Sequence, residues 1–144
     1  MKATKEEKEK ARQQIEELIN KIKNEGGLKK IDLGELIKPE KYAHIISKGL
    51  ELSRVQLRRI YTEFKNIYDT YQNSKKSKEV NVNKIKSSLY KLYPILQYQA
   101  SRQIIDDKFK ELMWKILDSL EKDPENFDNT MEFIKALVAY SPKE

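Results

Sequence analysis

Residues 52–71 read LSRVQLRRIYTEFKNIYDTY, and this stretch decides the fold class of the 144-residue chain. Apolar and aromatic side chains recur in it at intervals of three and four residues: Leu57, Ile60, Tyr61, Phe64, Ile67, Tyr68 and Tyr71. At 100° per residue they cover an arc of about 120°, the width of the stripe that a helix turns towards a core. Ser53 and Gln56 have the spacing of a capping box, so the pattern predicts a helix that begins at Arg54.

The same helical periodicity recurs along the rest of the chain, and no segment shows a convincing strand pattern. Charged residues make up 36% of the sequence, and there are only four glycines and four prolines, which favours helices over a turn-rich β fold. The sequence therefore predicts an all-α fold, a compact bundle of about five to six helices in a single domain over residues 1–144. The further helices are expected over residues 4–25, 39–50 and 81–96, and from about residues 106 and 128 onward.

Three features qualify this prediction. Residues 1–12 carry almost no apolar periodicity, so they are expected to fray or to await a partner. Residues 73–80, NSKKSKEV, are polar and unpatterned and are expected to form a basic loop. Pro94 lies inside the fourth predicted helix, which it either kinks or ends.

Several classes of function find no support in the sequence. There is no cysteine, so no disulfide and no thiolate metal site is available. His44 has no obvious carboxylate partner, and Asp106 and Asp107 lie at a helix start, where they complement the helix dipole. No nucleotide-binding loop, metalloprotease motif or nucleophile elbow is present. We expect no catalytic residue, metal or cofactor, and without an apolar stretch of about 20 residues we expect a cytoplasmic protein with no membrane partner.

Positive charge is concentrated in the middle of the chain. Residues 41–102 carry 13 basic and 4 acidic groups, a net charge of +9, whereas residues 103–144 carry 6 and 10, a net charge of −4. Such polarity suggests a polyanionic partner on one side of the molecule. Arg54, Arg58 and Lys65 project within about 40° of one another on the predicted helix. Basic side chains in this position also often cover apolar surface with their alkyl stems, so both interpretations stay open.

A second basic row depends on Pro94. If this proline only kinks its helix, Lys84, Lys91 and Arg102 align within about 20° over about 27 Å. If the proline ends the helix, the alignment is lost. Trp114 is a separate question, because it points about 130° away from the apolar stripe of its helix. It is either a contact hot spot or a side chain that another helix covers.

Three segments together resemble a known family. They are LSRVQLRRIYTEF at 52–64, KSSLYKLYPILQYQASR at 86–102 and FDNTMEFIKALVAY at 127–140. In their order and spacing they are similar to the small helical subunit of type III-A (Csm) CRISPR effector complexes. The resemblance covers about residues 40–140 and does not extend to the first predicted helix.

The resemblance implies a non-catalytic, RNA-binding structural subunit that lines up in several copies along guide RNA and target RNA. It would contact the RNA backbone without sequence specificity and would touch other subunits of the complex as well as its own copies. Arg58 and Arg102 lie inside the family-like segments. Charge and geometry add the remaining candidates for RNA contact: Lys48, Arg54, Arg59, Lys65, Lys84 and Lys91.

Two alternatives remain at this point. Arg59 points away from the first basic row and can pair with Glu63, and any of the candidates can instead bridge acidic groups between helices. The whole chain can also be a helical protein–protein adaptor with a basic face. Trp114 and the acidic residues 103–144 would then form its main surface.

Overall fold

The computed structural model describes residues 2–77 and 82–142, and over these ranges it contains eight α-helices, two short 3₁₀ helices and no β-strand. The predicted all-α fold is confirmed. There are more helices than the expected five to six, because one extra short helix is present and one predicted helix is divided. The helices are α1 (Lys5–Glu25), η1 (Leu28–Lys30), α2 (Leu33–Ile37), α3 (Tyr42–Gly49), α4 (Arg54–Ser77), α5 (Val82–Tyr90), α6 (Leu92–Ser101), α7 (Asp107–Lys122), η2 (Pro124–Asn126) and α8 (Phe127–Tyr140).

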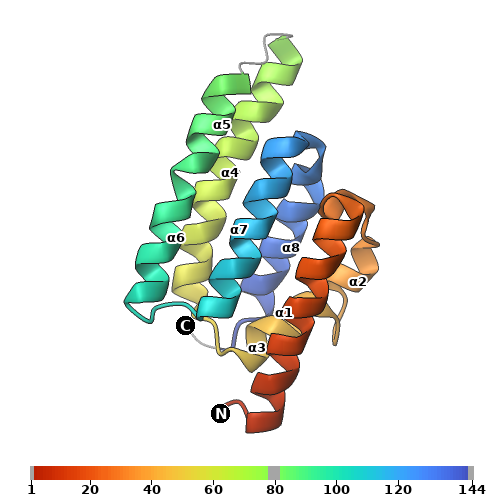
Figure 1. Cartoon of the computed structure of the whole chain (residues 1–144), viewed down its shortest axis with the longest axis vertical. Helices are drawn as coiled ribbons and strands as arrows, with labels where there is room; N and C mark the ends of the chain where they lie inside the picture. The colour runs from red at the N-terminus through yellow and green to blue at the C-terminus, as the bar shows by residue number, and fades with distance from the viewer. Residues whose placement is uncertain (1, 78–81, 143–144) are drawn as a thin grey trace.

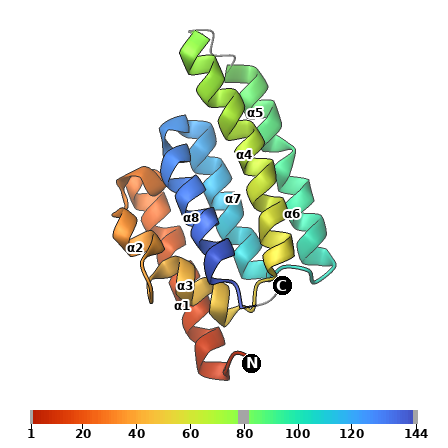
Figure 2. The ribbon, with the colours of Figure 1, turned by 180° about the vertical axis from the view of Figure 1, so that it is seen from behind.

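The long helices run nearly parallel to the long axis of the molecule and form two layers (Figure 1). One layer contains α5 and α6, α7 and α1; the other contains α4, α8 and the short pair α2 and α3 (Figure 2). Helix α1 packs against α3 and α7, and α8 packs against α3 and α4. The upper ends of α4 and α5 extend beyond α7 and α8 in both views.

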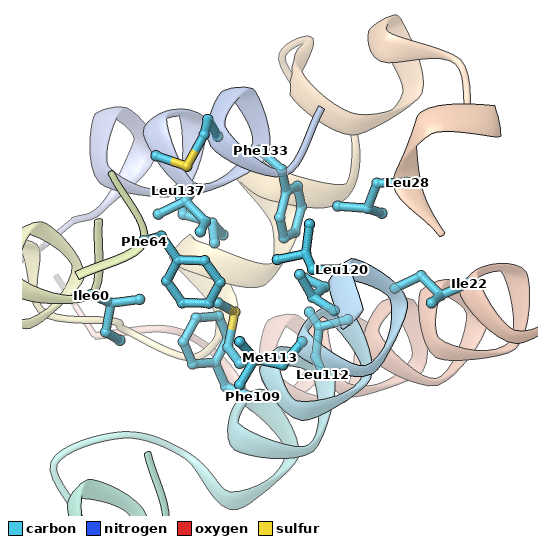
Figure 3. Close-up of a cluster of buried hydrophobic side chains, with 14 of the residues drawn as sticks. Ile22, Leu28, Ile60, Phe64, Phe109, Leu112, Met113, Leu120, Phe133 and Leu137 are labelled. Carbon is cyan, nitrogen blue, oxygen red and sulfur yellow. The ribbon is translucent and has the colours of Figure 1, made fainter. Parts of the chain in front are cut away.

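The core lies between the layers, and α1, α4, α7 and α8 each contribute several buried side chains to it. Figure 3 shows side chains from α1, η1, α4, α7 and α8 pointing towards one another. The apolar stripe of α7 is completely buried, as its periodicity predicted: Phe109, Leu112, Met113, Ile116, Leu117 and Leu120. Burying a side chain of this size contributes about 1.5–3 kcal/mol to stability, so this stripe is a large part of what holds the bundle together.

The predicted stripe of α4 is buried in its centre and half-buried at one edge. Five of its side chains belong to the core: Leu57, Ile60, Phe64, Ile67 and Tyr71. Tyr61 and Tyr68 pack only partly against it. The Tyr68 hydroxyl donates a hydrogen bond of 2.7 Å to Asp128 at the start of α8, and this bond together with burial raises the pKa of Tyr68. Tyr68 therefore joins α4 to α8.

Helix α1 includes the segment that the sequence suggested would fray. Thr4 caps the helix with a complete capping box, in which its side chain accepts from the Glu7 N–H and the Glu7 carboxylate accepts from the Thr4 N–H. This second bond and the nearby Lys48 lower the pKa of Glu7. The first apolar contact of the helix is Ala11, which is fully buried. The capping box pairs backbone N–H groups that the first turn of a helix otherwise leaves unpaired. It therefore stabilises residues 5–12 as a helix although they bury few apolar side chains.

The predicted loop over residues 73–80 is wrong for residues 73–77, which continue α4 as far as Ser77. The segment contains no glycine or proline to stop the helix. Lys75 and Lys76 lie in the last turn, where positive charge complements the helix dipole, and the Lys75 Nζ lies 5.2 Å from the centre of the Tyr71 ring. Residues 78–80 fall outside the described part of the chain.

Pro94 divides the fourth predicted helix into α5 and α6, with Lys91 between them. A proline has no N–H, so it cannot bond to the carbonyl four residues earlier, and its ring crowds that carbonyl. Here the carbonyl belongs to Tyr90, the last residue of α5. Lys91 keeps helical dihedral angles, and its N–H bonds to Ser87 at 3.3 Å, so the chain continues from one helix into the next without a loop.

The helix predicted from Pro39 begins only at Tyr42. Glu40 has a φ of 66°, which lies in the left-handed region and is incompatible with an α-helix. The Glu40 N–H donates to His44 Nδ1 at 2.9 Å, and the His44 ring stacks on Tyr140 with 4.5 Å between the ring centres. The histidine therefore has a structural position at the start of α3.

Candidate nucleic-acid interface

Of the first predicted basic row, two members have partners within the protein. Arg54 donates a hydrogen bond of 2.9 Å to the carbonyl oxygen of Ser141, which ties the start of α4 to the residue after α8. Lys65 donates to Asp69, one turn further along α4, at 2.7 Å, and this bond raises the pKa of Lys65. Arg58 is exposed, and the described residues give it no carboxylate partner. Arg58 is therefore the member of this row best placed for an external anion.

Arg59 lies beside Arg58 and also faces solvent. The ion pair between Arg59 and Glu63, which their spacing allowed, is not found among the described residues. Both arginines line a groove between α4 and α6 with a volume of about 340 Å³. The groove places two arginine side chains next to an apolar surface. The sequence did not predict this groove, because helical periodicity describes one helix at a time and not how two helices pack.

The second predicted row does not lie on one helix. Lys84 is on α5, Lys91 lies at the break, and Arg102 follows the last residue of α6. All three side chains are exposed. The continuous helix that their alignment required is not formed, because Pro94 ends the hydrogen-bonding pattern at Tyr90.

Arg102 has an aromatic neighbour one turn back on α6. Its guanidinium lies 5.5 Å from the centre of the Tyr98 ring and 3.4 Å from the Tyr98 hydroxyl oxygen. Tyr98 is 61% exposed, and Ile95, one turn further back, is 42% exposed. An arginine held on an exposed aromatic ring, next to an exposed aliphatic side chain, has the composition of a contact surface.

Lys48 is placed differently from the arginines. It lies on α3 and pairs with Glu7 of α1 at 3.4 Å, with more than half of its side chain exposed. It does not line the groove between α4 and α6. Its contact joins the first turn of α1 to α3, so a structural role accounts for its position.

Exposed apolar side chains on α6 are the part of this surface that the sequence analysis missed. Leu92 and Leu96 form the buried stripe of α6, and Ile95 lies outside it. The signal that could have found it is the segment LYPILQYQ, which has apolar residues on more than one side of a helix. Because α6 cannot bury every one of its sides, part of its apolar surface stays exposed.

Trp114 is covered by another helix, which is the second of the two interpretations that the sequence left open. The covering helix is α6: the Trp114 indole N–H donates to the Tyr93 carbonyl at 3.2 Å, and the two rings lie 6.0 Å apart. Lys110 covers the ring from another direction, with its Nζ 4.2 Å from the ring centre. An adaptor surface centred on Trp114 would therefore lack its exposed aromatic side chain.

The described residues offer neither a metal site nor a membrane span. Within residues 2–77 and 82–142, no group of three or more histidine, aspartate or glutamate side chains is arranged to hold a metal ion. In the same ranges, no helix combines the length and the apolar character that crossing a bilayer requires.

Most of the chain matches a known protein family. The family model described as Csm2 Type III-A matches residues 32–142, which include α2 to α8 and the groove between α4 and α6. Helix α1 lies before the matched range. No curated protein and no solved structure matches the chain.

Proposed function

Since the chain belongs to the Csm2 family, the small structural subunit of the type III-A CRISPR complex, we propose that it binds the backbone of guide RNA and target RNA without reading their sequence. On this proposal the protein has no catalytic residue and stacks in several copies beside the other subunits of the complex. The proposed contacts come from Arg58, Arg59, Lys91 and Arg102, with Arg54, Lys65, Lys48 and Lys84 as secondary candidates.

One observation carries the proposal beyond family membership. Arg58 and Arg59 are adjacent on α4, both exposed, and neither has a carboxylate partner among the described residues. Guanidinium groups without an internal partner are available for phosphate, which they bind in a bidentate geometry. Arg54, Lys65 and Lys48 rank lower because each already has an internal partner.

Phosphate contacts position a protein on RNA without specifying a sequence. Each phosphate neutralised should add about 0.7 to the slope of log affinity against log salt on a single strand, and about 0.9 on a duplex. One subunit would bind weakly, and copies side by side on one RNA would gain affinity through avidity.

The double variant Arg58→Ala/Arg59→Ala is expected to weaken RNA binding at low salt about tenfold or more. It should also reduce the salt slope by about 1 to 2, because up to two phosphate contacts are lost. The measurement is fluorescence anisotropy of the full chain with an RNA duplex and a single strand across a salt series. Circular dichroism checks that the variant is folded.

A matched control removes two positive charges elsewhere. Lys8 and Lys23 are exposed on α1, outside the range matched by the family model, so Lys8→Ala/Lys23→Ala should leave the slope nearly unchanged. Equal losses in both double variants would mean that net charge alone attracts the RNA. Strong, salt-dependent binding that ignores Arg58 and Arg59 would place the RNA on another face.

A further inference from the structure

Helix α4 carries positive charge further along one of its sides than the sequence predicted. Residues 73–77 are helical, so Lys76 belongs to the same continuous helix, Arg54–Ser77, as Arg58. Figure 2 shows this helix running along much of the long axis of the molecule. Eighteen residues separate Arg58 from Lys76, and this is five turns of an α-helix. The two side chains therefore start from the same side of α4, about 27 Å apart.

These two side chains are available to an anion, whereas the charge between them is neutralised. Arg58 and Lys76 are exposed, and the described residues give neither of them a carboxylate partner. Lys65 lies between them on the same side of the helix and is paired with Asp69 at 2.7 Å. This side of α4 thus offers two separate positive charges at a fixed spacing and not a continuous basic stripe.

The surface between the two charges is polar. None of the large apolar side chains exposed among the described residues lies between Arg58 and Lys76. A protein partner generally needs an apolar patch at the centre of its interface, whereas phosphates need only the charges. Glu63, an acidic residue in this interval, starts about 140° round the helix from Arg58. The exposed residues between the two positions are Thr62, Glu63, Asn66, Asp69, Asn73 and Lys75.

From this spacing we propose that α4 lies along an RNA duplex, with Arg58 and Lys76 bound to two backbone phosphates one duplex turn apart. Along one side of a duplex, the same strand returns after one turn, which measures about 34 Å in B-form DNA and less in A-form RNA. A spacing of about 27 Å, to which two long side chains add their reach, matches one such turn of roughly ten base pairs. A duplex is stiff and holds its phosphates at fixed distances, whereas a single strand bends to meet many spacings. The inference rests on the proposed RNA binding and adds the form and the length of RNA that one subunit recognises.

The test measures the affinity of the full chain for blunt RNA duplexes of about 6 to 14 base pairs, by fluorescence anisotropy across a salt series. Each affinity is divided by the number of positions that the duplex offers, so that length alone gives no gain. The corrected affinity of the wild-type chain should rise about three- to tenfold as the duplex approaches one turn, because the second phosphate then comes within reach of Lys76. The slope of log affinity against log salt should steepen there by about 0.9, the value of one duplex phosphate contact.

Lys76→Gln removes the charge and keeps a good helix former. It should abolish the rise with duplex length and leave the affinity for the shortest duplexes unchanged. Lys75→Gln is the matched control, because Lys75 is also exposed but starts about 100° round the helix from Lys76 and reaches over the Tyr71 ring. This variant should keep the rise, and so should Lys76→Arg, which keeps the charge. The length series on the wild-type chain tests the proposal even if a variant folds poorly.

Each other result contradicts a different statement. Salt-dependent binding whose corrected affinity and slope do not change with duplex length would overturn this inference and leave the proposed backbone binding intact. Absence of RNA binding by the wild-type chain would overturn the proposed function, and this inference with it. A rise that persists in Lys76→Gln would place the second phosphate contact elsewhere and overturn the role of Lys76. Loss of the rise in both Lys75→Gln and Lys76→Gln would mean that net charge, and not the position of Lys76, sets the affinity.

Discussion

Replacing Gly49 with alanine is expected to lower the melting temperature by roughly 10 °C, because a methyl group has no room where α3 crosses α1. A β-carbon on Gly49 would lie 2.5 Å from the Glu7 carbonyl oxygen and 2.6 Å from the Ala11 Cβ. Both atoms belong to α1 and cannot rotate away. Relief would require α1 to move as a whole away from α3, with which it makes one of its two main helix contacts.

The expected size follows from two opposing effects. Overpacking a tight contact costs about 1–3 kcal/mol, and occasionally more. Alanine is a better helix former than glycine, but Gly49 is the last residue of α3, where this gain is well below its maximum of about 1 kcal/mol. Because both close atoms are fixed in α1, the overpacking cost lies at or above the upper end of its range. The net loss is therefore about 2–3 kcal/mol, which for a chain of this length is close to 10 °C.

Gly34→Ala is the matched control for this prediction. A β-carbon on Gly34 would meet only side-chain atoms of Asp32 and Lys38, at 3.0 and 3.2 Å, and Lys38 can swing away. We expect this variant to melt within about 2 °C of the wild type. The measurement is thermal unfolding by circular dichroism, with limited proteolysis to show whether α1 becomes accessible first. Similar melting temperatures for the two variants would contradict the close crossing of α1 and α3.

Periodicity predicted the helical core well because the stripe of each helix is a local property of the sequence. The stripes of α4 and α7 are buried in the positions that their three- and four-residue spacing indicates. The Thr4 capping box shows that a missing apolar stripe is weak evidence against a helix. It stabilises the first turns of α1, where periodicity suggested fraying.

Two predicted helix boundaries, the end of α4 and the start of α3, were wrong because each was judged from the type of a single residue or from composition alone. Polar composition predicted a loop from residue 73, but polarity alone does not stop a helix that lacks glycine and proline. Pro39 looked like a first helical residue, but the backbone of the next residue, Glu40, is left-handed. At Pro94 the sequence predicted an interruption of the helix but did not decide between a kink and a break.

The candidate interface was predictable in part. Sequence and charge selected Arg58, Arg59 and Arg102, which the structure places on the surface. The partner of Arg54 could not be predicted, because Ser141 is 87 residues away along the chain. Lys76 was missed as well, because a loop was predicted from residue 73 and only the continued helix aligns Lys76 with Arg58.

Asn126→Ala is expected to destabilise the fold about as much as Gly49→Ala, for a different reason. Asn126 is fully buried between α7 and α8. Its Oδ1 accepts the Lys29 N–H at 2.9 Å, and its Nδ2 donates to the carbonyl oxygens of Gly26, Ser119 and Asp123 at 3.0–3.1 Å. One side chain thus bonds to backbone groups just after α1, in η1, in the last turn of α7 and just after α7.

Alanine at this position removes one hydrogen bond from each of those four backbone groups, although the Ser119 carbonyl keeps the Asp123 N–H at 2.9 Å and the Asp123 carbonyl keeps the Asn126 N–H at 3.1 Å. Each buried group that loses its only partner costs about 1–3 kcal/mol, and those that reach water lose less, so we expect a total of about 3 kcal/mol. This corresponds to a melting temperature roughly 10 °C below that of the wild type. Asn24→Ala, on the exposed side of α1, is the control and should change stability by less than about 0.5 kcal/mol.

Asn126→Asp separates lost hydrogen bonds from lost volume, because aspartate has nearly the shape of asparagine. Its carboxylate can accept the Lys29 N–H but has no N–H to donate to Gly26, Ser119 and Asp123, whose carbonyl oxygens repel the negative charge. Burial and these carbonyls should raise the pKa of the introduced carboxyl above its unfolded value. A raised folded-state pKa means that the folded state binds the proton more tightly, so the loss is largest at neutral pH and shrinks as the pH falls through that pKa. Denaturant unfolding at pH 7 and pH 5, with the wild type measured beside the variant, checks this: wild-type stability at both pH values would mean that Asn126 fills space and that its amide donors contribute little.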